Sequence, residues 1–409
     1  MKYNIKVLLL LLSAIIFLVP SNLFIKIAVD QAYVNGLLVD YLIPKFYLSD
    51  IFIIILLLLW LIKVIKNKTQ VSFKKENWAI YFLLPIFIVR QLLTPYPLAA
   101  VWYVLKIAEL SLLFLFLNKH QPLLKKPLIY FTIVSTIIFQ SSLAIWQFLT
   151  QKTFLGFRFF GEPNLANSIG LTKDMWWHTG RVLPYATTPH PNILGGILAI
   201  FSLFLITNNQ NKILTSFCVS LALIIIVLTQ SISALSILIS GLLLLALKPH
   251  YQQVANFKKK MTIGLIVMFF IMPVLINLAS KLSTADSLAR RDYLQNAALE
   301  MLRENLIFGV GLNQFAARVE EYSSSKEVVR FVQPVHHVGM LWVAETGLLG
   351  IILLLIIGKK INWGKATLPL LILLPIISLD HYLLTQQSGM LLFVLQLNHI
   401  GRWSRYSWS

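Results

Sequence analysis

The run "PVHHVGMLWVAETGLLGIILLLIIG", residues 334–358, decides the fold class, because an apolar stretch follows two adjacent histidines. A helix needs about 20 predominantly apolar residues to cross the hydrocarbon core of a bilayer. Similar runs recur along the chain, and they predict an all-α, polytopic integral membrane protein with about 12 transmembrane helices. The predicted spans lie near residues 5–20, 49–66, 78–93, 97–118, 128–149, 192–208, 214–230, 232–248, 261–280, 337–358, 366–384 and 386–400.

Composition supports a membrane protein and argues against a soluble one. Hydrophobic residues make up 57% of the 409 residues and charged residues only 12%, whereas a soluble domain has about 25% charged residues. The net charge of +19 also occurs in nucleic-acid-binding proteins, but lysine-rich loops between apolar spans follow more simply from the positive-inside rule. Cys218 is the single cysteine, so neither a disulfide nor a cysteine metal site is expected.

The chain is predicted to form a single membrane domain, residues 1–409, in which two long external loops separate groups of helices. Its N-terminus is expected to be an uncleaved first helix, because no small-x-small cleavage site follows it. Residues 21–48 are expected to form a re-entrant or interfacial segment. The predicted regions are a five-helix N-terminal region (1–149), an external loop (150–191), a four-helix region (192–280), a long external catalytic loop (281–336) and a C-terminal three-helix region (337–409).

Basic residues predict the sidedness of the loops. Lysines gather in alternate loops, around residues 63–75, 119–126, 212, 248–260 and 359–365, and such loops are expected on the cytoplasmic side. Both termini then face the cytoplasm, and the loops 150–191 and 281–336 face outside the inner (cytoplasmic) membrane. These external loops hold seven of the ten arginines, namely Arg158, Arg181, Arg290, Arg291, Arg303, Arg318 and Arg330.

The arginines on the external side predict an anion site. Guanidinium presents a planar fork of donors that matches phosphate or carboxylate, which ammonium does not. A plainer explanation is that long loops are translocated whatever their charge. Within the second loop, apolar residues recur at helical spacing over residues 288–302 and predict an amphipathic helix on the membrane surface. We expect Arg290 and Arg291 in its first turn, where a cation is unfavourable and a bound anion would relieve the cost.

Histidines stand at two helix starts on the same predicted face. "TTPHPNILGG" places His190 and Asn192 before the sixth span, and "PVHHVGMLWV" places His336 and His337 before the tenth. Histidine can accept a proton in one step and return it in the next, while arginines can hold a diphosphate and stabilise its charge as it leaves. This combination suits glycosyl transfer from a lipid diphosphate, with Arg in the role of the metal cation, and we expect no metal.

The stretch from His336 resembles a motif of the O-antigen ligase and O-antigen polymerase superfamily of bacterial envelope proteins. The ligase motif is His, then Asn, Ser or Gln, nine residues, Gly, two residues, and Gly or a similar residue. Here His336 opens the frame, and Gly347 and Gly350 close it. His337 occupies the position where the family has Asn, Ser or Gln.

A second element, "ARRDYLQNAALEMLRENLIFGVGLNQF", is similar to the family's Arg-led amphipathic helix that ends in Gly-x-Gly. Its register places Arg291 at the family arginine and Gly309 and Gly311 at the glycines. The aromatic residue usual four positions after that arginine is Gln295 here.

The third element, "RVLPYATTPHPNILGG", resembles the family's Arg followed shortly by a Pro-Asn that opens a membrane helix. Pro191 and Asn192 match, while Arg181 lies about two residues earlier than the family spacing. In "LTQSISALS", Ile232 replaces a common family arginine. The resemblance covers roughly residues 150–400, and the first four spans are compatible with it.

The resemblance implies a GT-C-like glycosyltransferase of the cell envelope. Such an enzyme moves a glycan from undecaprenyl diphosphate to an acceptor hydroxyl at the external face, without a metal or a nucleotide sugar. His336 would be the base and Arg291 would hold the diphosphate. The further substrate-binding candidates are Arg290, Arg181, Arg158, His337, His190, Asn192 and Arg330.

Several alternatives stay open at this point. The acceptor could be a lipid, a growing glycan, as in an O-antigen polymerase, or a protein, as in an O-oligosaccharyltransferase. Asn192 capping its helix is an equal alternative to a place in the pocket wall. A carrier of lipid-linked glycans would show internal repeats and polar groups near the midplane, and a non-catalytic scaffold would tolerate loss of His336 and Arg291.

Three other features carry expectations. Trp176 and Trp177 are expected to anchor the first external loop at the interface rather than stack on sugars. Glu345, inside a span, is expected to be protonated or paired with a buried basic group. Asp380 and His381 form another polar pair, which simple exposure at the outer end of the eleventh span would explain equally well.

Overall fold

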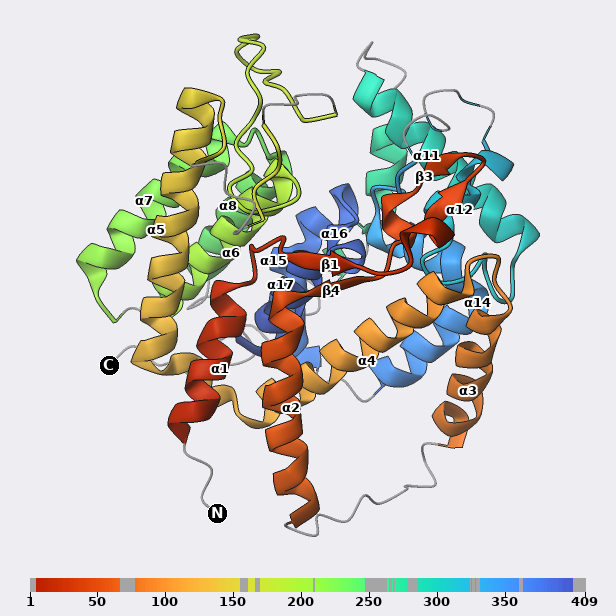
Figure 1. The fold of residues 1–409 in the computed structure, drawn as a ribbon, viewed down its shortest axis with the longest axis horizontal. Helices are drawn as coiled ribbons and strands as arrows, with labels where there is room; N and C mark the ends of the chain where they lie inside the picture. The colour runs from red at the N-terminus through yellow and green to blue at the C-terminus, as the bar shows by residue number, and fades with distance from the viewer. Residues whose placement is uncertain are drawn as a thin grey trace.

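The computed structural model describes residues 5–66, 78–154, 161–165, 170–208, 210–246, 263–264, 267, 269–278, 286–323, 325, 328, 332–359 and 363–399. These residues form a mostly α-helical bundle with small β-elements at one end (Figure 1). The longer helices are α1 (Ile5–Phe17), α2 (Leu48–Lys66), α3 (Trp78–Leu92), α4 (Pro97–Lys119), α5 (Pro127–Thr150), α6 (Pro191–Asn208), α7 (Lys212–Leu228), α8 (Ile232–Ala246), α11 (Asp286–Glu304), α14 (Val338–Gly358), α15 (Trp363–Leu379) and α17 (Gln387–His399). The short elements are β1 (Phe24–Lys26), β2 (Tyr33–Val34), β3 (Leu37–Leu38), β4 (Lys45–Tyr47), α12 (Phe315–Arg318) and α16 (Tyr382–Thr385).

The helices identify an all-α membrane protein. Among the described residues, five helices are long and apolar enough to cross a membrane, namely α2, α4, α5, α6 and α14. Shorter apolar helices cover most of the other predicted spans, at Ile5–Phe17, Tyr81–Leu92, Lys212–Leu228, Ile232–Ala246, Phe269–Leu278 and Ala366–Leu379. The number twelve stays a prediction, because several of these helices are shorter than a bilayer requires.

Helix α6 forms the centre of the bundle. It packs against α5, α7, α8 and α17, and nearly all its side chains are buried. A helix that is apolar all round is stable where protein surrounds it on every side. By contrast, α2 and α14 expose rows of Leu and Ile along much of their length, as expected for helices in contact with lipid.

The described part of the loop between α5 and α6, together with α11, lies at one end of the bundle (Figure 1). The start of α1 and the last turn of α2 lie at the opposite end. The two long loops that are rich in arginine therefore share one end, as the sidedness prediction requires.

Residues 24–47 form a small layer at this same end, over the helices. β1 pairs antiparallel with β4, and β2 with β3. Ala32, Val39, Leu42 and Ile43 pack with the alanines of α12 in one apolar cluster. The segment predicted to be interfacial therefore packs on the second long loop.

Helix α14 is broken at Gly347, whose φ of 58° and ψ of −156° are not helical. The loop after α11 enters this break: Leu348 N donates to the carbonyl of Leu306 at 2.9 Å, and Gly311 N donates to the carbonyl of Glu345 at 2.9 Å. A Cβ on Gly309 would come within 2.4 Å of the Glu345 carbonyl carbon. Gly309 and Gly347 are thus required because backbone meets backbone here, whereas a Cβ on Gly311 would meet the Thr94 side chain.

We predicted that Glu345 would be protonated or paired with a buried basic group, and among the described residues it contacts backbone amides instead of a base. Its carboxylate accepts hydrogen bonds from the backbone N–H groups of Asn313, at 2.9 Å, and Phe315, at 3.1 Å. These amides lie at the start of α12, where helix N–H groups lack intrahelical acceptors. The acid therefore binds backbone amides and not a buried basic group.

Helix α11 buries one face, through Leu294, Ala297, Ala298 and Met301, against the loop that follows it and against α14. The predicted helix is confirmed, and its described part begins at Asp286; its place on the membrane surface stays a prediction. Arg290 and Arg291 therefore lie in its second turn, and the argument from an unfavourable cation in the first turn was wrong.

A charged network lies inside the bundle. Lys106 of α4 donates to Asp50 of α2, and at 3.0 Å to Glu109. Gln387, which begins α17, donates to the other Asp50 oxygen at 2.6 Å. Buried ions are stable only when paired and hydrogen-bonded, so this network ties α2, α4 and α17 together.

Candidate functional site

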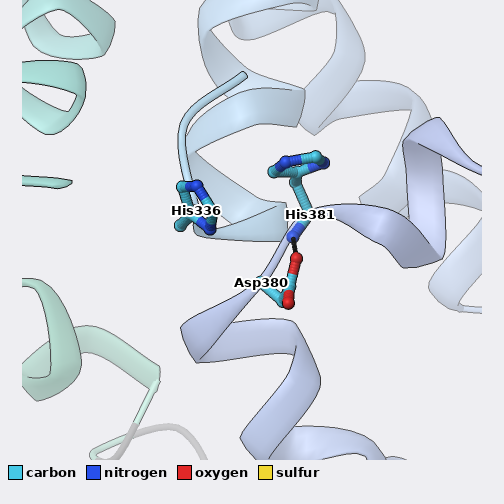
Figure 2. Close-up of side chains that lie close together, drawn as sticks. All are labelled: His336, Asp380 and His381. Carbon is cyan, nitrogen blue, oxygen red and sulfur yellow. Dashed lines mark hydrogen bonds between the residues drawn. The ribbon is translucent and has the colours of Figure 1, made fainter. Parts of the chain in front are cut away.

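Three side chains with proton-binding or metal-binding atoms meet at the end of the bundle that carries the long loops. His336 precedes α14, while Asp380 and His381 lie between α15 and α16. One nitrogen or carboxylate oxygen from each lies within 4.8 Å of the others. Figure 2 shows His336 facing the Asp380–His381 pair, and the two imidazole ring centroids are 4.9 Å apart.

Hydrogen bonds orient both members of the pair. Asp380 accepts from the backbone N–H of His381 at 2.8 Å and from the Asn192 side-chain amide at 3.2 Å. The Nδ1 atom of His381 pairs with the Thr385 hydroxyl at 2.7 Å. This contact occupies Nδ1, and the ring of His381 lies beside that of His336.

His190 joins the cluster from the start of α6. Its Nδ1 accepts from the backbone N–H of Asn192 at 3.1 Å, and Thr172 pairs with its Nε2 at 3.2 Å. The histidine thus caps a helix whose first residue, Pro191, has no N–H to satisfy. Because His190 is the cap, the Asn192 side chain is directed to Asp380 instead of to its own helix.

Arg291 contributes the positive charge. It projects from α11 and interacts electrostatically with Asp380, His336, His190 and His381. The structure therefore brings together His336, Arg291, His190 and Asn192, which come from three separate segments. Asp380 is the acidic group that they share.

Burial sets the protonation of the cluster. It lowers the pKa of His336 well below its ordinary value, and His381 and Arg291 lower it further. Burial likewise lowers the pKa of His381 to about 4, against the opposing effect of Asp380. Burial alone would raise the pKa of Asp380, but the surrounding histidines and Arg291 bring it below its ordinary value. At neutral pH the histidines are uncharged bases, and one carboxylate faces one guanidinium.

Tyr41 covers the cluster from the layer of residues 24–47. Its ring lies edge-on to His381, with centroids 5.7 Å apart, and its carbonyl accepts from the Asn313 amide at 2.8 Å. Sequence reasoning missed Tyr41, because nothing in the pattern of residues 21–48 indicates that this segment folds over the eleventh and twelfth spans.

His337 acts as a helix cap. It is 1% exposed, its Nδ1 accepts from Met340 N at 3.1 Å, and its Nε2 pairs with the carbonyl of Phe269 at 3.2 Å. Asn and Ser are also favoured at helix caps. His337 therefore orients the helix that carries His336, and its ring nitrogens are occupied.

The other predicted arginines differ in position. The Arg181 guanidinium donates to the carbonyls of Phe148 and Leu149 at the end of α5, at 3.0 and 3.4 Å, so it closes that helix and is not brought to the cluster. Arg290 is the neighbour of Arg291 on α11. Arg158 and Arg330 lie outside the described residues.

Asp380 and His381 are the residues whose importance the sequence analysis underestimated. Simple exposure does not explain them, because they are only 5% and 6% exposed. The available signal was an adjacent acid and histidine at the same predicted end of the bundle as His336. It was too weak alone, since spacing along the chain does not show which helix ends are neighbours.

A rigid loop lies beside the end of α7. Asp174 accepts from the backbone N–H groups of Trp176 and Trp177, at 3.0 Å each, and from Thr179 N at 2.9 Å. Gln230, just after α7, also donates to Asp174. The two indoles remain exposed by 43% and 46%, a position that suits an interfacial anchor.

No family model matches this chain, and no curated protein matches it.

Proposed function

We propose that this chain is an O-antigen ligase-like glycosyltransferase with a GT-C-like arrangement of helices. It would move a glycan from undecaprenyl diphosphate to an acceptor hydroxyl at the external face of the cytoplasmic membrane. One observation supports the proposal above all. His336, Arg291, His190 and Asn192, which belong to three separate sequence motifs, surround a single buried carboxylate, Asp380.

The chemistry follows from the positions of these groups. Arg291 holds the diphosphate of the donor, and neutral His336 accepts the proton of the acceptor hydroxyl as its oxygen attacks the anomeric carbon. The bond between that carbon and the phosphate oxygen breaks, and undecaprenyl diphosphate leaves with its new charge next to Arg291. The proton stays on His336, where Asp380 stabilises the imidazolium.

Donor binding would also activate the base. The charge of Arg291 lowers the pKa of His336 in the free protein. Burial and His381 are the larger causes of the low pKa and remain, but a diphosphate bound to Arg291 cancels the charge of that arginine, so the pKa of His336 is higher than in the free protein. The base therefore becomes stronger when the donor is in place.

The test is the surface and lipid-linked polysaccharide pattern of a deletion strain, complemented with the wild type, His336→Ala or Arg291→Ala. His120→Ala is the matched control, because His120 packs on Phe116 at the end of α4. We expect both site variants to insert normally and to lower transfer by about 10²- to 10⁴-fold. Wild-type transfer by either variant would remove that residue from the site.

The pattern also separates the possible acceptors. Full-length chains that accumulate on the lipid carrier indicate a ligase, and single repeat units at the surface indicate a polymerase. A glycoprotein that disappears in the deletion strain indicates a protein acceptor. A normal pattern of lipid-linked, surface and protein-bound glycans would overturn the proposal.

A further inference from the structure

The cluster around His336 has the donor set of a transition-metal site. Two imidazoles and a carboxylate offer nitrogen and oxygen ligands within 4.8 Å of one another. Three protein ligands of this type, with a fourth position open, are the common arrangement for Zn²⁺ at reactive sites. Mg²⁺ and Ca²⁺ prefer sites made of oxygen atoms, so the chemistry selects an ion of the zinc class.

The surroundings of the ligands support the same conclusion. A histidine that binds a metal usually has its other ring nitrogen hydrogen-bonded, which fixes the orientation of the ring. His381 Nδ1 is held by the Thr385 hydroxyl at 2.7 Å, so Nε2 is the nitrogen that would bind the ion. Asp380 is likewise oriented by Asn192 and by the backbone N–H of His381.

His336 is the ligand that can move. Ligand atoms that bind one Zn²⁺ at about 2.0–2.1 Å in a tetrahedron lie about 3.3 Å apart, so the cluster must contract. Nε2 of His336 is 3.5 Å from the Gln333 side chain, which is a weak contact, and its buried Nδ1 has no hydrogen-bond partner among the described residues. Rotation of this ring closes the site without breaking a good hydrogen bond.

We propose that His336, Asp380 and His381 bind one Zn²⁺ ion when the donor is absent, and that this ion blocks transfer. Binding would use the lone pair with which His336 accepts the acceptor proton, so metal and reaction exclude each other. This second half rests on the proposed function, whereas the metal site does not.

Substitution of Arg291 should change the Zn²⁺ affinity in a direction that a general loss of structure would not produce. Its guanidinium interacts with the same side chains and repels a dication. Removal of that charge by Arg291→Gln should therefore tighten Zn²⁺ binding while it weakens transfer. Removal of a ligand, as in His381→Gln or Asp380→Asn, should loosen Zn²⁺ binding.

The experiment uses the purified full chain in detergent, treated with a chelator and then titrated with Zn²⁺ by calorimetry, with Mg²⁺ as the control ion. We expect one Zn²⁺ per chain, a loss of affinity of at least about tenfold in His381→Gln and Asp380→Asn, and a similar loss in Thr385→Val. His120→Ala should bind as the wild type does. Substitution of Zn²⁺ by Co²⁺ should give the visible spectrum of a four-coordinate site. This measurement requires neither the glycan donor nor the acceptor.

The outcomes separate the two halves. Absence of stoichiometric binding, or binding that is unchanged in the ligand variants, would overturn the metal site and leave the proposed function untouched. Weaker binding in Arg291→Gln would contradict the assigned arrangement of charge. Stoichiometric binding together with full transfer at saturating Zn²⁺ would overturn the inhibitory half, and would also remove His336 as the base.

Discussion

The substitution Gly347→Ala tests whether the break in α14 holds the site together. Gly347 has a φ of 58° and a ψ of −156°, a region that is nearly restricted to glycine and costs other residues about 1–3 kcal/mol. An added Cβ would also lie 2.6 Å from Gly309 N and 2.7 Å from the Ile307 carbonyl carbon. Overpacking against atoms that cannot move away costs about 1–3 kcal/mol. The sum is a loss of about 2–6 kcal/mol in the free energy of unfolding.

The control is Gly36→Ala in the β2–β3 turn. Gly36 has a φ of +80°, and a Cβ there would meet nothing within 4 Å. Gly36→Ala should therefore lower the free energy of unfolding by the backbone strain alone, about 1–2 kcal/mol. The difference between the two variants therefore measures the backbone contact between the loop and α14.

The assay is thermal and denaturant unfolding of both variants in the same detergent, together with the transfer assay. Gly347→Ala should unfold at a clearly lower temperature than Gly36→Ala. It should also lose transfer, because the loop fixes α11, with Arg291, against α14, which His336 precedes. A displacement of about 1 Å between such groups can cost about 10²-fold in rate. Equal stability and equal transfer in the two variants would refute the reasoning.

Three further predictions follow from the structure. Lys106→Met leaves Asp50 without its buried ion-pair partner and should lower the free energy of unfolding in detergent by about 3–5 kcal/mol. The double variant Lys106→Met/Asp50→Asn should recover part of this loss. No recovery would show that the two residues act independently. Hydrogen bonds outweigh burial at Asp174 and lower its pKa below the ordinary 3.8. The ionised carboxylate therefore stabilises its loop above pH 3.8, and this stabilisation is lost as the pH falls below the ordinary value towards the lowered pKa. Tryptophan fluorescence should show an acid transition in the wild type that Asp174→Asn lacks. A reporter inserted after Ser324 should be read on the external side of the cytoplasmic membrane, and a cytoplasmic signal would reverse the sidedness of the proposed site.

Much of the helical framework was predictable because hydropathy acts locally. Long apolar runs such as those of α6 and α14 are recognisable as helices from the sequence alone. The helical spacing of Leu294, Ala297 and Met301 likewise predicted α11. The layer of residues 24–47 was less predictable, since its strands are only two or three residues long and are held by packing on α12. Local sequence does not contain that partner.

The site was predictable in its parts and not in its assembly. His336 stood out because titratable groups are unusual beside apolar helices, but its proposed role and that of Arg291 came from the resemblance to the family motifs. Asp380 was not recognised as their common partner, since only the packing of α15 beside the start of α14 reveals it. For Glu345, the sequence allowed either a protonated acid or a buried basic partner, and it did not indicate the backbone amides that the side chain contacts.

The buried pair of Lys106 and Asp50 has a consequence for biogenesis. A lysine at the centre of a helix costs about 2.5–3.5 kcal/mol when that helix enters the bilayer. Asp50 precedes Lys106 in the chain, so we expect its neutralising charge to be in place before α4 inserts. Gln387, which completes the network, is synthesised hundreds of residues later. The order of synthesis thus lets an early ion pair guide α2 and α4 together, and α17 locks that pairing last.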